Sequence, residues 1–397
     1  MKAIVLTGPG TIVTADVGEP DATGKALIRL ELVGICGTDV KIAKGEIPVA
    51  YPRVLGHELI GRVVRAGPRG VLVTFADGLK LFFKESITPT NADRPVYLLA
   101  PILATIPAFL AFSVIPFGAP VTIFGRTVPL QLADLNIGVL WVLAMTSIGV
   151  YAVVLAGWSS GSNYPLLGAV RSTAQMVSYE VAMSLALVAV IMFSGHLTMS
   201  EIVAQQDKVW NVIPQFPAFV VYLICALAEV NRPPFDLAEA ESELVAGFHT
   251  EYSGIRFALF YLGEYVNTVT VSAIAVTLFL GGWRGWWPFH GAAAWLGPVL
   301  WFVLKVTAVI YVYILVRGTL PRMRYDRLMN FGWKYLIPFG LFWVLATGAI
   351  VVLPDRYGHR RGTFIATGLI VATWLVMSLV KQLLEAPGTP MTEDVAA

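Results

Sequence analysis

The long apolar runs of this chain limit its fold more than any other feature of the sequence. An α-helix needs about 20 consecutive apolar residues to cross the hydrocarbon core of a bilayer. About eight stretches approach or reach that length, and the fourth is short and carries Glu229. The predicted spans are Val96–Pro116, Gly138–Gly157, Thr173–Phe193, Phe216–Val230, Phe257–Gly282, Pro298–Arg317, Tyr335–Leu353 and Phe364–Val380. We therefore expect an all-α polytopic membrane protein with about eight transmembrane helices.

The composition agrees with a membrane protein and excludes several kinds of site. Charged residues make up 14% of the chain, against about 25% in soluble proteins. The net charge of +2 gives no reason to expect nucleic acid as a partner. Cys36 and Cys225 are the two cysteines, too few for an iron–sulfur cluster, and no nucleotide-binding glycine motif occurs. We expect no flavin and no cluster on this chain, and no complete active site without partner proteins.

The first 66 residues differ in character from the rest. Branched residues gather in Lys2–Thr7, Ala26–Val33 and Leu59–Val64, between Gly, Pro and Asp. This pattern predicts a small, soluble, β-rich fragment. No secretory signal is expected, because residues 1–20 have no continuous apolar core.

Four segments follow from these contrasts. We expect the β-rich fragment over residues 1–66 and a seam over residues 67–95, in which Phe75–Lys84 forms a short amphipathic helix. The transmembrane domain is expected over residues 96–383 and a polar tail over residues 384–397.

The positions of Lys and Arg predict the orientation in the membrane, since cytoplasmic loops are enriched in both. Most Lys and Arg residues lie before the first predicted span or after the second, fourth and sixth spans. These four segments all lie on the same side of the membrane. These residues are Lys80, Lys84, Arg94, Arg171, Arg232, Arg256, Arg317, Arg322, Arg324, Arg327 and Lys334. That side is predicted to be cytoplasmic, as are both termini, although Arg356, Arg360 and Arg361 lie on the opposite side.

Four ionisable residues fall within or near predicted spans, where charge is costly and indicates function. They are Glu180, Glu229, Glu264 and Lys305. Glu264 and Lys305 could instead simply neutralise each other. Cys225 is expected to be a buried small residue. Trp283, Trp286 and Trp287 are expected to form an interfacial aromatic belt.

The loop after the fourth span is rich in acids. Arg232, Pro233, Pro234 and Phe235 are followed by Asp236, Glu239, Glu241 and Glu243. In a helix Glu239 and Glu243 would share one face, and neighbouring like charges raise each other's pKa. Such a cluster could supply protons to a path into the membrane. The alternatives are a solvated face or a docking site for a basic partner.

Long strings of the sequence resemble one known family. Residues 68–353 are similar to the H subunit of NADH-quinone oxidoreductase, the bacterial counterpart of subunit 1 of mitochondrial complex I. The matching strings are Phe75–Lys80, Gly168–Arg171, Ser178–Glu180, Ala228–Asp236 and Glu251–Gly254.

The resemblance implies a multi-pass protein of the bacterial inner membrane that assembles with other subunits of the complex and contacts membrane lipid. Its substrate would be a quinone, either ubiquinone or menaquinone, and Arg232, Pro233, Pro234 and Phe235 would belong to the quinone-chamber loop. The resemblance also implies which acids couple quinone reduction to proton translocation. They are Glu180, Glu229, Asp236, Glu239, Glu241, Glu243 and Glu264.

Residues 1–66 resemble a second family, the zinc-dependent medium-chain alcohol dehydrogenases. The matching strings are Gly34–Asp39, Lys44–Pro48 and Gly56–Glu58. In that family residues matching Cys36 and His57 bind zinc, and Glu58 could be a third ligand. The dinucleotide-binding domain and the structural-zinc cysteines are missing, so we do not expect bound zinc.

The junction departs from the first family. Its members begin with a transmembrane helix and a basic loop, and only Gly67-Pro68-Arg69-Gly70 resembles that loop here. The alternatives to a complex subunit are a stand-alone proton-coupled transporter or channel, a membrane-anchored zinc dehydrogenase, and a fusion product without function.

Overall fold

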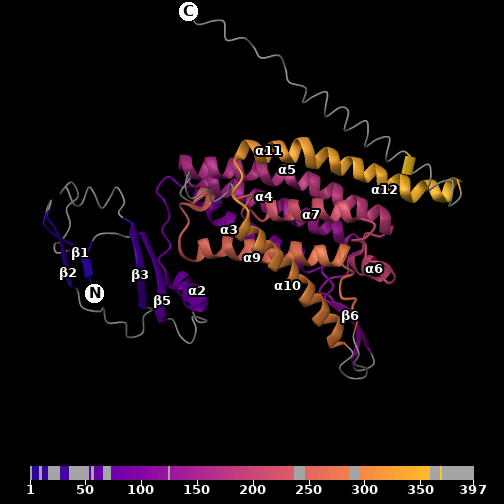
Figure 1. Cartoon of the computed structure of the whole chain (residues 1–397), viewed down its shortest axis with the longest axis horizontal. Coiled ribbons are helices and arrows are strands. Elements are labelled where there is room, and N and C mark those ends of the chain that lie inside the picture. Colours follow the sequence, from indigo (N-terminus) through magenta and orange to yellow (C-terminus); the bar gives the residue numbers. More distant parts are fainter. Residues whose placement is uncertain are drawn as a thin grey trace, which may run out of the picture. The chain divides into compact units, whose positions relative to one another are not determined.

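The computed structural model describes residues 2–8, 11–16, 27–34, 53–54, 58–65, 73–123, 126–236, 246–286, 295–357 and 367–368. It divides into two compact units, Met1–Lys84 and Glu85–Ala397, which are coloured along the sequence in Figure 1.

In the first unit the described residues form short antiparallel strands and a helix. Strands β1 (Lys2–Gly8), β2 (Thr11–Asp16) and β4 (Arg53–Val54) form a sheet in the order β2-β1-β4. Strands β3 (Leu27–Gly34) and β5 (Glu58–Arg65) form a second antiparallel pair. Helix α2 spans Val73–Phe83. The predicted β-rich character and the helix near residues 75–84 are confirmed.

The second unit is helical. Among the described residues, six helices are long and apolar enough to cross a membrane. They are α3 (Arg94–Phe112), α4 (Gly138–Ser159), α5 (Asn163–Ser194), α9 (Gly254–Phe279), α10 (Leu296–Thr319), and the stretch from α11 (Tyr325–Phe331) through the π-helical turn η4 (Gly332–Leu336) into α12 (Ile337–Tyr357). Helix α7 (Phe216–Glu229) is apolar but shorter. The polytopic helical fold is confirmed, with each of the first seven predicted spans matched by a helix.

Local sequence explains where several helices begin and end. Proline occupies the first turn of α3 and of α7, where its missing N–H costs no hydrogen bond. Gly195 follows α5 with a φ of 72°, a backbone conformation that suits glycine at a helix C-terminus. The helix predicted from Tyr335 begins at Tyr325 instead. Its first turn is polar, so the apolar run from which the span was predicted begins later. The predicted span Phe364–Val380 falls almost entirely outside the described residues.

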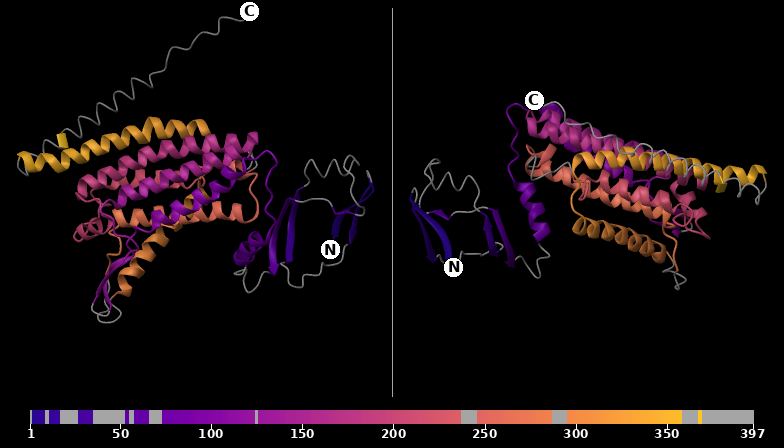
Figure 2. Two further views of the ribbon diagram at one scale, coloured as in Figure 1. Left: turned by 180° about the vertical axis from the view of Figure 1, so that it is seen from behind. Right: turned by 45° about the horizontal axis from the view of Figure 1, so that its top comes forward.

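Shorter elements connect the helices. They are the hairpin strands β6 (Gly118–Ile123) and β7 (Arg126–Leu130), helix α6 (Met199–Gln205) and the 3₁₀ turn η2 (Gly247–His249). The hairpin was not predicted. Helices α3 and α4 pack together, and α5 contacts α4, α7 and α12; Figure 2 shows α5 and α12 side by side.

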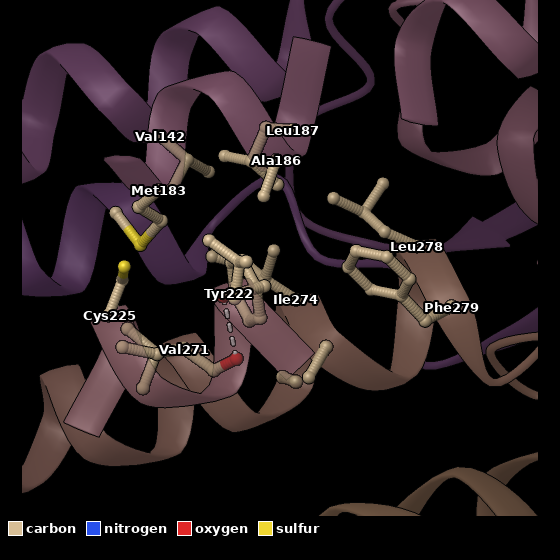
Figure 3. Close-up of a cluster of buried hydrophobic side chains, with 14 of the residues drawn as sticks. Val142, Met183, Ala186, Leu187, Tyr222, Cys225, Val271, Ile274, Leu278 and Phe279 are labelled. Atoms are coloured by element: carbon tan, nitrogen blue, oxygen red, sulfur yellow. Dashed lines mark hydrogen bonds between the residues drawn. The ribbon is translucent and has the colours of Figure 1, made fainter. Parts of the chain in front are cut away.

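The main core lies where α4, α5, α7 and α9 meet. Figure 3 shows the side chains of Val142, Met183, Tyr222 and Cys225 gathered there. The Tyr222 hydroxyl donates to the Val271 carbonyl over 2.9 Å. Cys225 is fully buried, as expected, and the small residues of α7 allow neighbouring backbones to approach closely.

Candidate functional site

A cavity of about 90 Å³ lies between α3, α4, α5, α7, α9 and η2. Among the described residues, the acids Glu229 and Glu264 line it together with Asn231, His249 and Asn267. A water molecule needs about 10–15 Å³ of such volume and two to four polar partners. The cavity therefore has room and polar groups for several water molecules.

Glu229 is the last residue of α7 and is 4% exposed. Its Oε2 atom has no hydrogen-bond partner among the described residues. Buried carboxyl oxygens are normally bonded to protein or water, so water or a bound proton is expected at this group. Glu229 is one of the acids predicted from the sequence, and the structure places it on the cavity wall.

Glu180 lies on α5 and is paired with α4. Its Oε1 atom is within hydrogen-bond reach of the Ser147 hydroxyl, which also lies 2.9 Å from the Leu143 carbonyl. One hydroxyl has one proton to donate, so a protonated Glu180 can donate to Ser147 while Ser147 donates to Leu143. Glu180 and Glu229 are close enough for their charges to interact.

Glu264, on α9, pairs with the loop that follows α7. Its Oε1 atom lies 3.3 Å from Nε of Arg232, and the guanidinium of Arg232 lies 5.0 Å from the ring centre of Tyr265.

The suggested neutralisation of Glu264 by Lys305 is wrong. The Lys305 ammonium donates to the carbonyls of Leu280, Gly282 and Arg284 at 2.7, 3.1 and 2.6 Å, where carbonyls left unpaired beyond the end of α9 attract a cation.

One buried side chain of α5 holds the loop of residues 230–236 in place. The Gln175 amide nitrogen donates to the carbonyls of Ala228 and Phe235 at 2.7 and 2.6 Å. Asn231 has a φ of 52°, in the left-handed region that Asn tolerates better than most residues. The loop is thus shaped by specific bonds rather than left free.

The rest of that loop is packed into the protein. The Phe235 ring lies 5.7 Å from that of Tyr179, and the Pro234 carbonyl accepts a hydrogen bond from the Met323 amide at 3.0 Å. Pro234 and Phe235 are buried, while Arg232, Pro233 and Asp236 are partly buried. The predicted loop residues therefore lie beside the helices that carry Glu180 and Glu229.

His249 is a site residue that sequence reasoning missed. It is 5% exposed and lines the cavity from η2. Burial lowers the pKa of its imidazole to about 4. Its position between Glu243 and Glu264 in the sequence could have indicated a site residue. Its proximity to Glu229 and Glu264, however, depends on the fold.

Several predicted site residues lie outside the described part of the chain. Glu239, Glu241 and Glu243 fall in residues 237–245, and Cys36 and His57 are also outside. Glu58 begins β5. Among the residues that the structure describes, no three His, Cys, Asp or Glu side chains are grouped so that they could hold a metal ion.

The helices and the acid-lined cavity define a polytopic membrane protein that can hold water and ionisable groups at depth. The family model of NADH dehydrogenase matches residues 58–348. The chain is also 49% identical over 383 residues to the H subunit of the NADH-quinone oxidoreductase of Frankia casuarinae, with 94% of this chain and 84% of that protein covered. The chain therefore belongs to the NADH dehydrogenase family.

The N-terminal part matches a second family model, that of the alcohol dehydrogenase GroES-like domain, over residues 22–89. Both resemblances inferred from the sequence are confirmed. The two matches overlap over residues 58–89, and the alignment with the Frankia protein reaches into the first 66 residues of this chain. The stand-alone transporter is not favoured.

Proposed function

We propose that this chain is the membrane subunit of a proton-translocating NADH-quinone oxidoreductase in a bacterial cell membrane. It forms part of the quinone chamber and links quinone reduction to proton translocation. The other subunits of the complex are its partners and carry the flavin and iron–sulfur clusters. The substrate is a quinone, either ubiquinone or menaquinone.

The observation that supports this role most strongly is the gathering of acids around one cavity. Glu229 and Glu264 line it from α7 and α9, and Glu180 lies near Glu229 on α5. Reducing a quinone to quinol takes up two protons and passes through negatively charged forms. Negative charge near a carboxylate favours its protonated form, so each reduction cycle can move protons among these acids.

The loop of residues 230–236 connects these acids with the quinone. Arg232, Pro233, Pro234 and Phe235 form the chamber loop in this proposal. Asp236, Glu239, Glu241 and Glu243 extend the proton path from it. Gln175 donates hydrogen bonds at both ends of this loop. A change of charge in the chamber would therefore be transmitted to Glu229 through the backbone of this loop.

The segments keep their proposed boundaries: a GroES-like fragment over residues 1–66, a seam over 67–95, a transmembrane domain over 96–383 and a tail over 384–397. Enzymatic activity belongs to the complex. Cys36, His57 and Glu58 are not proposed as a zinc site.

A tagged purification combined with one matched pair of variants tests this function. The chain is purified through a C-terminal tag from native membranes, and peptides spanning Arg65 to Leu79 are sought by mass spectrometry beside flavin- and cluster-bearing subunits. Membrane vesicles with Glu229→Gln should lose most quinone-linked proton uptake, whereas Glu201→Gln, at an exposed ion pair with His196, should keep it. Purification of the chain alone, or equal uptake in both variants, would contradict the proposal.

A further inference from the structure

His249 occupies an unusual position for a histidine. It ends η2, and its side chain lies on the wall of the same cavity as Glu229 and Glu264. Its Nδ1 atom is buried without a hydrogen-bond partner among the described residues. A buried polar atom of this kind calls for an explanation, and the role proposed above for the acids supplies none.

The imidazole is fixed in place by its neighbours. The rings of Phe257 and Tyr261 on α9 meet it edge-on, with centres 5.4 and 5.8 Å away. The turn itself is held by α5, because a Cβ added to Gly168 would lie 2.8 Å from the backbone of Gly247. These ring contacts orient the imidazole relative to the cavity.

Few charged groups surround this ring in the described part of the chain. Glu229 at the end of α7 and Glu264 on α9 share the cavity with it, and Tyr261 contacts it directly. Arg232 reaches the same region through its pair with Glu264. Helices α3, α4 and α5 line the cavity with uncharged residues only. Carboxylates are therefore the charges that can favour a protonated imidazole here.

A neutral imidazole has one donor and one acceptor nitrogen, so it can take a proton from one neighbour and pass one to another. With a pKa of about 4, about one His249 in 10³ is protonated at pH 7. An ionised carboxylate close to an imidazole favours the protonated form of the ring. The His249 imidazole is therefore neutral except during a proton transfer, when it is transiently protonated.

We propose that His249 is a proton-transfer residue of the cavity, which exchanges protons through cavity water between Glu229 and Glu264. This proposal depends on the function proposed above. One proton is taken from water at one ring nitrogen to give an imidazolium, and one proton is released to water on the other side. No net charge remains, and no oxidant or reductant is needed.

The test compares His249→Asn with His196→Asn in inside-out membrane vesicles that contain the whole complex. Asn keeps a donor and an acceptor but cannot be protonated in this pH range. His196 is a half-exposed histidine that pairs with Glu201 at 3.1 Å. NADH-driven proton uptake, quinone reduction and the solvent deuterium isotope effect are measured between pH 6 and pH 8.

His249→Asn should lower proton uptake by about a hundredfold or more, the lower end of the usual contribution of a positioned proton-transfer residue, and should change the isotope effect. His196→Asn should stay within about twofold of the unmodified protein. In His249→Ala, added imidazole should restore uptake, whereas thiazole, a ring of similar shape without an N–H, should not. A purely structural role would respond equally to both rings.

Three results separate the possible failures. If the unmodified complex shows no quinone-linked proton uptake, the proposed function itself is wrong. If it does, and His249→Asn matches it over the whole pH range, only the role of His249 is wrong. If neither His249→Asn nor His249→Gln assembles, His249 is a structural residue and the inference is overturned.

Discussion

The Nε atom of Arg232 lies 3.3 Å from Oε1 of Glu264, joining the loop after α7 to the middle of α9. Both side chains are largely shielded, with 12% and 22% of their surfaces exposed. This ion pair places a guanidinium beside one of the acids on the cavity wall.

Replacing Arg232 with Gln should impair both stability and coupling. Removing one partner of a partly buried pair leaves the other charge poorly compensated, at a cost of about 1–3 kcal/mol after allowance for solvent screening. Thermal unfolding in detergent and proton uptake in vesicles measure the two effects. The control is Arg324→Gln, whose pair with Asp326 is exposed and should contribute less than about 0.5 kcal/mol. Equal effects in the two variants would count against a special role for the Arg232 pair.

Gln175→Leu should release the chamber loop. Two buried carbonyls, of Ala228 and Phe235, lose their donor, at a cost of about 2–4 kcal/mol. Gln215→Leu is a matched control, since Gln215 is equally buried but bonds to Trp343 and Thr347 at the other end of α7. Both variants should melt earlier, and only Gln175→Leu should also lose quinone-linked proton uptake. Loss of uptake in both would mean that the loop is not the sensitive element.

His249 should make the protein less stable in acid. Burial lowers its pKa from 6.5 to about 4, so the unfolded chain binds a proton below about pH 6.5 that the folded chain refuses. The folded state therefore loses about 2 kcal/mol between pH 8 and pH 5 through this group. Melting temperatures of the purified chain at both pH values, with and without His249→Asn, isolate the contribution. The variant should show a smaller drop, and an identical drop would refute the assignment.

Gly168→Ala should disturb η2. The new methyl group would lie 2.8 Å from Gly247 backbone atoms, and overpacking of this kind costs about 1–3 kcal/mol. Gly149→Ala on α4 adds the same methyl group where nothing lies within 4 Å, and should be neutral or slightly stabilising because Ala favours helix. Thermal melting compares the two. A larger loss in Gly149→Ala would show that the helix contact has been misjudged.

The apolar runs predicted the helices well because a bilayer imposes length and composition on each span. Helix α5 shows the limit, since the structure extends it from the predicted Thr173 back to Asn163. The added turns contain Arg171, and this charged residue lowers the hydropathy of the segment, so the predicted span began after it. The start of α11 was missed for the same reason.

The site was predicted only in part, because its geometry depends on contacts between distant segments. Charge alone suggested Lys305 as the partner of Glu264. Lys305 instead donates to backbone carbonyls beyond the end of α9, and the positions of backbone carbonyls cannot be predicted from side-chain charges. Gln175 lies inside the predicted span Thr173–Phe193, but its side chain carries no charge and it was passed over. His249 was passed over because it lies outside every predicted span. Their roles follow from burial, which only the fold reveals.

Helix α7 has 14 residues, a length of about 21 Å against a hydrocarbon thickness of about 30 Å. One end of it therefore stops short of the lipid headgroups. Irregular backbone is tolerated at such depth only when protein or water surrounds it, and residues 230–236 are buried or partly buried. If the helix starts at the outer surface, Glu229 and this loop lie about 9 Å beneath the opposite headgroups. A membrane of different thickness would then change the distance that protons travel to reach the cavity, and lipid chain length becomes a determinant of coupling.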